Sequence, residues 1–211
     1  MEIIVHKNNI PAIISALERE YPEAVCSLRY EKDYELLFST RLAAQCTDER
    51  VNMITPHLFT RFSSLEEFAQ ADITELEQII HSCGFFRIKA RDLIDCARML
   101  LEEFGGRVPD NMDDLLKLPG VGRKTANIIL GDIYGKPSVV TDTHCIRISN
   151  RLGMVDSKNP YKVEMRLAEI IPSEKQTAFC HMLVFHGRAV CTARSPKCHI
   201  CTLNDYCAKR L

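Results

Sequence analysis

The sequence predicts an all-α fold, and two observations lead to that prediction. Apolar residues recur at helical spacing along the chain, and most such stretches are bounded by residues that typically start or stop helices. The one strand-like run, residues 138–140, is too short to form a sheet without partners, and no other candidate stands nearby. We therefore expect roughly ten helices and no sheet.

Helix boundaries follow from capping residues, prolines and glycines. The expected helices run through residues 11–17, 35–45, 49–62, 87–104, 113–117, 126–130, 143–152, 160–171 and 174–190, with two shorter ones after Ser64 and Asp72. Their expected caps are Asn8 or Asn9, Asp48, Ser64, Asp72, Asp142, Asn159 and Ser173. Pro56 falls inside one helix and is expected to bend it.

Composition describes an ordinary globular protein. Its 211 residues, 46% hydrophobic and 26% charged, allow one large domain or two small ones. Residues 1–7 lack the pattern of a signal peptide and no apolar run approaches membrane-spanning length, so we expect a cytoplasmic protein without membrane contact. A net charge of −1 gives no support for nucleic-acid binding, which must therefore be argued from local motifs.

Residues 118–127 form a glycine turn that opens a helix and places Lys124 in its first turn. A cation there is locally unfavourable, because it faces the positive end of the helix macrodipole. Residues that are locally unfavourable in this way often belong to functional sites. Backbone N–H groups of the turn and helix start can form a small anion site for a DNA phosphate. The Gly-x-Gly spacing alone fits a plain corner between helices equally well, but the flanking Leu118-Pro119 and Lys124-Thr125 favour a phosphate-binding helix-hairpin-helix.

Lys124 and Asp142 are the candidate catalytic pair. A partly desolvated amine at a helix N-terminus should have a lowered pKa, and a neutral amine is a nucleophile. The alternative is that the Lys124 ammonium only binds a DNA phosphate. The Asp142 carboxylate could accept the lysine's proton or stabilise a cationic, sugar-like transition state. Asp142 also stands where a helix cap belongs, and the two roles are compatible.

The ten cysteines fall into two groups. Six are scattered, mostly in apolar helical stretches, and are expected to be small buried hydrophobes: Cys26, Cys46, Cys83, Cys96, Cys145 and Cys180. The other four, Cys191, Cys198, Cys201 and Cys207, can close one tetrahedral metal site or one cubane cluster. Only one close pair is present, so the spacing favours iron–sulfur over zinc. Arg194 and Lys197 lie in a basic loop that could meet the phosphate backbone.

Together, the hairpin, residues 140–144 and the four-cysteine signature resemble the endonuclease III family of helix-hairpin-helix DNA glycosylases. The resemblance extends from about Tyr21 to Cys207 and includes residues 44–48 and 84–90. It implies two helical domains, a six-helix barrel (26–136) and an iron–sulfur cluster domain built from both chain ends (1–25 and 137–211), with DNA in the cleft between them. The implied cofactor is a [4Fe-4S] cluster held by the four C-terminal cysteines.

The resemblance also implies a bifunctional glycosylase and abasic-site lyase of base-excision repair. Lys124 would attack the anomeric carbon of a flipped-out oxidised pyrimidine and form a Schiff base whose β-elimination nicks the strand, assisted by Asp142. The implied partner is duplex DNA with an oxidised pyrimidine or abasic site, bound by a monomer. Gln45 would fill the gap in the duplex and Phe85 would act as an apolar wedge; the other expected DNA contacts are Lys89, Gly120, Val121, Gly122, Arg123, Thr125, His144, Arg194 and Lys197.

Two departures and two alternatives accompany the resemblance. Phe85 stands where the best-known members carry a smaller aliphatic wedge, and Leu116 stands where some carry a glutamate implicated in proton handling. Adenine-mismatch glycosylases lack the lysine and carry a catalytic glutamate near residues 40–44, where this chain has no carboxylate. The alternative from another class is a non-catalytic DNA-binding protein whose cluster senses redox state.

Overall fold

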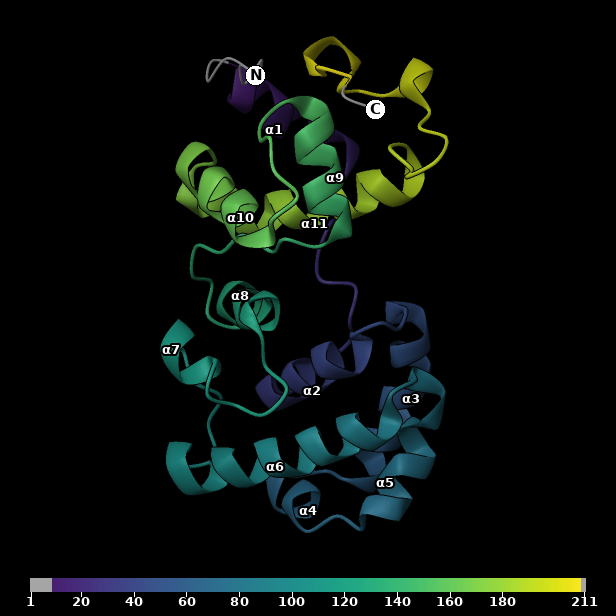
Figure 1. The fold of residues 1–211 in the computed structure, drawn as a ribbon, viewed down its shortest axis with the longest axis vertical. Helices are drawn as coiled ribbons and strands as arrows, with labels where there is room; N and C mark the ends of the chain where they lie inside the picture. The colour runs from purple at the N-terminus through teal and green to yellow at the C-terminus, as the bar shows by residue number, and fades with distance from the viewer. Residues whose placement is uncertain (1–8, 210–211) are drawn as a thin grey trace. The chain divides into compact units, whose positions relative to one another are not determined.

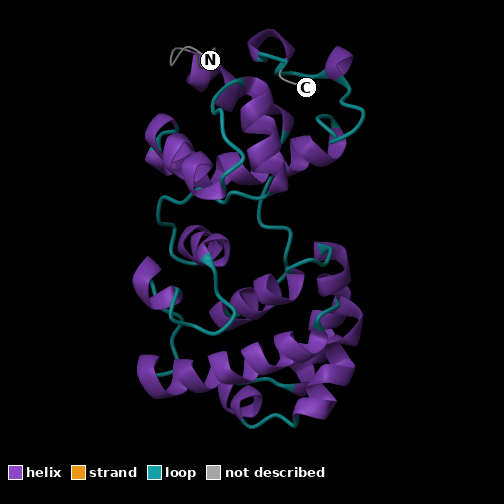
Figure 2. Cartoon of the chain, in the orientation of Figure 1, coloured by secondary structure: helices purple, strands orange, loops and turns teal. Residues whose placement is uncertain are grey.

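The computed structural model describes residues 9–209, and within that range every regular element is a helix (Figure 2). The predicted all-α class is confirmed. Residues 1–7, considered above for a signal peptide, and the candidate cap Asn8 lie outside the described residues. The chain divides into two compact units, residues 27–134 and residues 1–26 together with 135–211. None of the helices described is both long and apolar enough to cross a lipid bilayer.

Aromatic packing holds the unit of residues 27–134 together. Phe68 lies at its centre, with ring centroids 4.8 Å from Phe38 and 5.2 Å from Phe62. The longest helix, α6, runs beside α4 and α5 (Figure 1). The elements of this unit are α2 (Asp33–Ala43), α3 (Asp48–Arg61), α4 (Leu65–Ala69), α5 (Ile73–Ile80), the 3₁₀ turn η2 (His81–Cys83), α6 (Phe86–Phe104), α7 (Met112–Leu115) and α8 (Arg123–Asp132).

The second unit joins both ends of the chain around one apolar core. Leu17 of the first helix, Ile148 of α9 and Leu183 of α11 are all fully buried in this core. Helix α9 packs across α11 (Figure 1). The elements of this unit are α1 (Ile10–Glu20), α9 (Thr143–Leu152), α10 (Pro160–Ile170), η3 (Ser173–Lys175), α11 (Gln176–Ala189), η4 (Cys198–Ile200) and η5 (Asn204–Tyr206).

Four of the predicted helix caps are present as hydrogen bonds, and one of them is Asp142 at the start of α9. The side chains of Ser64, Asp72 and Asn159 accept the backbone N–H three residues further on, at 3.3, 2.9 and 3.1 Å respectively. Each bond satisfies one of the N–H groups that the first helical turn leaves without a partner. These short polar residues therefore fix where α4, α5 and α10 begin.

Three predicted helix starts are wrong in detail. Thr47, rather than Asp48, caps α3: its Oγ1 accepts the Arg50 N–H at 3.2 Å, and Asp48 is already helical. Asn9 precedes α1 in a helical conformation and makes no side-chain cap bond. Ser173 begins a 3₁₀ turn instead of capping α11 directly. For Asp48 and Ser173 the residue type is right for a helix start, but the cap position lies one or two residues away. For Asn9 the position is the predicted one and only the side-chain bond is missing.

Candidate functional site

The glycine turn between α7 and α8 lies against an ion pair. Arg41 of α2 and Asp92 of α6 approach to 2.6 Å. Gly120 sits over them with a φ of +73°, and a Cβ there would lie 2.6 Å from Arg41 Nε and 2.8 Å from Asp92 Oδ2. Both the left-handed backbone and the lack of room therefore require glycine. The ion pair fixes the turn against two longer helices.

The N-terminus of α8 carries no side-chain cap. Its N-cap residue, Gly122, has no side chain to offer, and the first turn holds no acidic residue. No side chain of the N-cap residue therefore competes with an external anion at this helix start, where backbone N–H groups commonly bind anions. Lys124 stands in this turn and is exposed, whereas Arg123 and Thr125 beside it are half-buried. Because Lys124 as a whole is exposed, burial within the described residues gives no support to the expectation that the protein itself partly desolvates its amine.

Asp142 caps α9. Its Oδ1 accepts the Cys145 N–H at 2.7 Å, which holds the half-buried carboxylate in one position. His144 follows in the first turn, with Nδ1 3.1 Å from Arg147 Nη2. A Cβ on Gly187 of α11 would lie 2.3 Å from that same Nδ1, so only glycine leaves space for the imidazole. Helices α9 and α11 thus approach closely where the first turn of α9 carries His144.

Two exposed turns carry left-handed residues that are not glycine. Gln45, just after α2, has a φ of 55°, and Phe85, just before α6, has a φ of 48°. Both side chains are exposed, Phe85 to 62%. Non-glycine residues in this conformation are uncommon and cluster at functional sites. Leu116 is also 41% exposed, at the end of α7, so it lies on the surface as a site residue must.

Lys89 is buried, which corrects the expectation that it contacts DNA. Only 1% of its surface is exposed, and Nζ donates to the carbonyls of Leu42 at 2.8 Å and Cys83 at 2.9 Å. Burial lowers the pKa of the Lys89 ammonium. Both carbonyls come from helix ends, where they lack helical partners. Lys89 therefore ties the end of α2 to the turn before α6 and does not face solvent.

The four C-terminal cysteines line one cavity. Cys191, Cys198, Cys201 and Cys207 all face it, together with Arg151. Within residues 9–209, no three His, Cys, Asp or Glu side chains are grouped as ligands of a single metal ion. Four cysteines around a shared space are, however, the donor set of a cubane iron–sulfur cluster, whose irons are ligated individually. The chemistry of the donors fits such a cluster.

Polar side chains surround these sulfurs. Arg151 is 8% exposed, and its Nη1 lies 3.3 Å from Cys191 Sγ and 2.7 Å from the carbonyl of Thr192. His186 Nε2 lies 3.5 Å from Cys201 Sγ, and its Nδ1 lies 3.1 Å from the Tyr21 hydroxyl. Burial lowers the pKa of His186 to about 4, so the imidazole is neutral at pH 7. Such contacts orient ligands and tune a metal centre.

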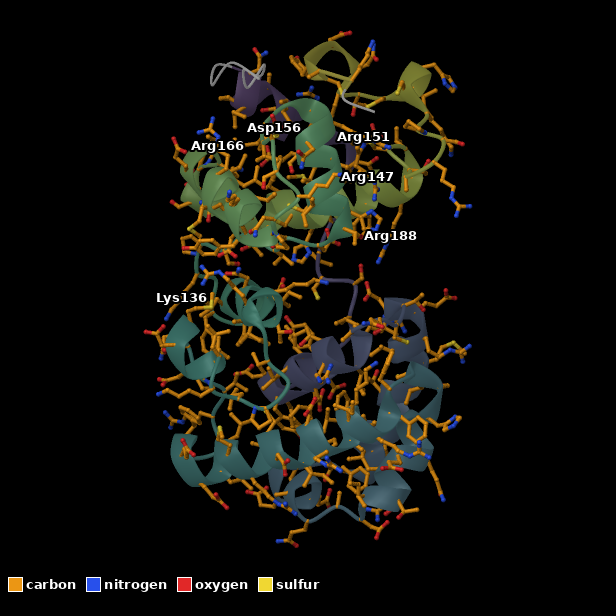
Figure 3. The ribbon with its side chains drawn as sticks, viewed as in Figure 1. Lys136, Arg147, Arg151, Asp156, Arg166 and Arg188 are labelled. Atoms are coloured by element: carbon orange, nitrogen blue, oxygen red, sulfur yellow. The ribbon has the colours of Figure 1, made fainter. Side chains whose placement is uncertain are left out.

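Sequence reasoning missed these supporting residues. Figure 3 labels Arg147 and Arg151 on α9, whose guanidinium groups reach carbonyls that follow α11. The partners lie 40 or more residues away in sequence, so no local pattern marks them. Arg194 and Lys197, which the sequence did single out, are exposed in the loop between the first two cysteines of the signature.

Comparison with known families identifies the chain. A family model described as "HhH-GPD superfamily base excision DNA repair protein" matches residues 38–173, which span α2 through α10 and include the hairpin, Lys124 and Asp142. The chain belongs to this HhH-GPD superfamily. A second model, the iron-sulfur binding domain of endonuclease III, matches residues 191–207 of this HhH-GPD protein, beginning and ending on a cysteine of the signature.

Individual relatives agree with this assignment. The HhH-GPD chain is 45% identical to endonuclease III of Synechocystis sp. over 202 residues, covering 95% of this chain and 92% of the relative. It is 40% identical to endonuclease III of Bacillus subtilis, covering 89% and 86%. A solved structure of a trapped endonuclease III–DNA covalent intermediate, an estranged-adenine complex, matches with a TM-score of 0.92 and 38% identity, covering 98% of this chain and 97% of that one.

The HhH-GPD protein is therefore a DNA glycosylase and abasic-site lyase of base excision repair. It binds DNA and carries a [4Fe-4S] cluster. These conclusions confirm the fold class, enzyme class and cofactor expected from the sequence, and they disfavour a non-catalytic DNA-binding protein.

Proposed function

We propose that this protein removes oxidised pyrimidines from duplex DNA and nicks the resulting abasic site through Lys124. The observation that carries the proposal is the start of α8, where an exposed lysine stands in the first turn of a helix without a side-chain cap. A phosphate bound at the open N–H groups brings the sugar backbone to the amine. The likeness to endonuclease III of Synechocystis sp. and Bacillus subtilis supports the same substrate class.

The reaction uses Lys124 as nucleophile. Its uncharged amine attacks the anomeric carbon, the glycosidic bond breaks and the base leaves with a proton. The second proton of the amine nitrogen then passes to the ring oxygen O4′ as the C1′–O4′ bond breaks, which opens the sugar ring and gives a Schiff base. Removal of a C2′ proton then expels the 3′ phosphate by β-elimination. Since Lys124 is exposed in the protein alone, DNA itself must cover the amine and desolvate it.

Asp142 assists this reaction from a fixed position. One carboxylate oxygen is held by the Cys145 N–H at 2.7 Å, so the helix cap restricts how the other oxygen can move. Groups preorganised in this way stabilise developing charge without reorganising during the reaction. We assign Asp142 to accepting the lysine's proton or to stabilising the cationic sugar.

DNA contacts divide between two tasks. Gln45 and Phe85 extend from exposed turns and would enter the gap left by the flipped nucleotide, with Phe85 presenting a large apolar surface. The remaining proposed contacts hold the backbone without reading sequence: Gly120, Val121, Gly122, Arg123, Thr125, His144, Arg194 and Lys197.

The cluster and the domains complete the proposal. We assign Cys191, Cys198, Cys201 and Cys207 as the cluster ligands, because all four line one cavity. When bound, the cluster supplies a cross-link that holds the loop bearing Arg194 and Lys197. We further propose that residues 26–136 form a six-helix barrel domain and that residues 1–25 and 137–211 form the cluster domain, bounds that lie within two residues of those of the two compact units. We also propose that the protein acts in the cytoplasm as a monomer.

Covalent trapping tests this function. Cluster-loaded protein is incubated with a duplex containing thymine glycol, and borohydride is added to reduce the Schiff base to a stable amine. We expect a covalent protein–DNA adduct with the unmodified protein, none with Lys124→Gln, and full adduct with Lys158→Gln, which alters an exposed lysine in the turn before α10. A folded, cluster-loaded protein that gives no adduct would refute the proposal and favour non-catalytic DNA binding.

A further inference from the structure

One buried histidine contacts two of the four C-terminal cysteines. His186, in the last turn of α11, is 1% exposed, and its Nε2 lies 3.5 Å from Cys201 Sγ. Its backbone carbonyl accepts the N–H of Cys191 at 2.8 Å. The side chain and the main chain of one residue therefore reach the third and the first cysteine of the signature.

The other ring nitrogen of His186 is held by a residue from the opposite end of the chain. Tyr21, which directly follows α1, places its hydroxyl 3.1 Å from Nδ1, although the two residues are 165 positions apart. The two rings meet edge to face, with centroids 5.8 Å apart and an interplanar angle of 71°. The backbone N–H of Tyr21 donates to the Leu17 carbonyl at 2.8 Å. Both nitrogens of the buried imidazole thus have a partner, and rotation of the ring would break both contacts.

The direction of both hydrogen bonds follows from the chemistry of a ligating cysteine. A cysteine that ligates iron is a thiolate and has no proton to donate. His186 Nε2 must therefore carry a proton and donate to Cys201 Sγ. A neutral imidazole then accepts at Nδ1, and the Tyr21 hydroxyl, which keeps its proton at neutral pH, is the donor. The chain of hydrogen bonds runs from the hydroxyl through the imidazole to the sulfur.

This contact differs from that of Arg151 with the first cysteine. The Arg151 guanidinium lies 3.3 Å from Cys191 Sγ and carries a full positive charge, and it also binds two carbonyls of the adjoining loop. Arg151 therefore supports the loop as well as the sulfur. The His186 ring is engaged by one hydroxyl and one sulfur, so its effect on that sulfur can be separated from the stability of the loop.

We propose that Tyr21 and His186 are positioning residues for the iron–sulfur cluster, and that the hydrogen bond from His186 Nε2 fixes Cys201 as a ligand and raises the cluster's reduction potential. This role rests on the ligand assignment proposed above for Cys201. A hydrogen bond to a ligating thiolate strengthens as the cluster gains negative charge, so it stabilises the reduced form over the oxidised one. Tyr21 acts through His186, because its hydroxyl selects the tautomer with a proton on Nε2.

Electrochemistry tests this role on cluster-loaded protein without DNA. The reduction potential is measured by voltammetry, and cluster retention in the presence of an iron chelator is followed by visible absorbance. For His186→Leu we expect the ratio of oxidised to reduced cluster at a fixed potential to rise about tenfold, which is a lowering of the potential by about 59 mV for one electron. Iron loss should be faster by about 10- to 100-fold, the usual cost of removing a partner of a metal ligand.

Two further variants distinguish hydrogen bonding from packing. His186→Gln keeps an N–H donor on a side chain of similar reach and should restore much of the potential that His186→Leu loses. Tyr21→Phe keeps the aromatic ring against His186 and removes only the hydroxyl. It should raise the ratio of oxidised to reduced cluster by about two- to threefold, because the imidazole then samples both tautomers. If His186→Leu fails to fold, Tyr21→Phe decides the result.

Matched control variants come from the same unit of the protein. Tyr206→Phe removes the hydroxyl of another half-buried tyrosine that packs against the same apolar core. His199→Leu replaces an exposed histidine inside the cysteine segment itself. Both controls should keep the reduction potential and the cluster retention of the unmodified protein.

Two results would overturn this role. One is an unchanged reduction potential in both His186→Leu and Tyr21→Phe. The other is an equal shift in His186→Leu and His199→Leu, which would mean that the potential responds to any change near the cysteines. A normal cluster content and spectrum in Cys201→Ala would instead refute the ligand assignment on which the role rests. None of these measurements needs glycosylase activity, so a failure of the proposed catalytic function leaves them unaffected.

Discussion

Helices α8 and α9 begin in opposite ways, although each carries one residue of the proposed catalytic pair. Helix α8 starts at Gly122, which offers no side chain, and Lys124 extends from its first turn. Helix α9 starts at Asp142, whose carboxylate is bound to the Cys145 N–H. The start of α8 therefore offers no side chain of its N-cap residue to the first backbone N–H groups, whereas the start of α9 binds one of these groups with the Asp142 carboxylate.

The difference shows how a helix start can serve either binding or catalysis. A start with glycine at the cap forgoes about a few tenths of a kcal/mol of helix stability relative to a polar cap, and it leaves backbone N–H groups to an external phosphate. A capped start recovers that stability and immobilises a carboxylate. The hairpin before α8 instead packs Gly120 against the Arg41–Asp92 ion pair.

Asp142→Asn gives the largest expected effect, because it keeps the cap and removes the charge. Asparagine and aspartate cap helices about equally well, so the thermal midpoint should barely change. Turnover in a thymine glycol release assay should fall by roughly 10²–10⁴, the usual contribution of a positioned acid or base. Asp142→Ala should lose that activity and also about 1 kcal/mol of stability.

The reverse exchange at another cap provides the control. Asn159 caps α10 by accepting the N–H three residues further on, as Asp142 does, and it stands 17 positions after Asp142 (159 minus 142). Asn159→Asp should leave both turnover and stability unchanged. If Asp142→Asn turned over at the normal rate, Asp142 would be only a cap and α9 would contribute no catalytic group.

Gly120→Ala should destabilise the hairpin that supports α8. A left-handed alanine costs about 1–2 kcal/mol, and the new Cβ would also overlap Arg41 and Asp92. Gly105→Ala separates the two contributions, since Gly105 is left-handed with φ +59° but a Cβ there would meet no atom within 4 Å. Chemical denaturation measures both variants. Equal losses of unfolding free energy in the two variants would mean that the Arg41 and Asp92 side chains move aside at little cost, so that their ion pair does not fix the turn.

Gly122→Ser should make the start of α8 resemble that of α9, with the smallest expected effect. A Cβ at Gly122 meets no atom within 4 Å, and the serine hydroxyl can accept an N–H of the first turn. Stability should rise by a few tenths of a kcal/mol. DNA binding, measured by fluorescence anisotropy, should weaken by about 1 kcal/mol because the hydroxyl competes with phosphate. Unchanged binding would show that DNA does not use these N–H groups.

The fold could be predicted largely because its signals are local. Helix periodicity, glycine stops and short polar caps act within a few residues, and they correctly located α4, α5 and α10 through Ser64, Asp72 and Asn159. The helix-hairpin-helix and the four-cysteine segment were found for the same reason. Each motif lies within one short stretch of sequence, so its spacing can be recognised without knowledge of the tertiary structure.

Predictions that depended on distant neighbours were less accurate. Lys89 looked like a surface cation, but carbonyls from two helix ends, one of them 47 residues away, receive its ammonium in the interior. Cys46 looked like a buried apolar residue and lies half-buried at an exposed turn. Lys124 was expected to be partly desolvated and is exposed. Burial is decided by which segments pack together, and single-sequence patterns do not record that.

Arg151 has a consequence for the segment that bears the four cysteines. Its guanidinium binds the carbonyls of Thr192 and Ala193 and reaches Cys191 Sγ, all from a buried position on α9. One buried arginine therefore couples the start of the cysteine segment to a helix that precedes Cys191 by 40 positions in the chain. A substitution that shifts α9 would shift the first of the four sulfurs with it.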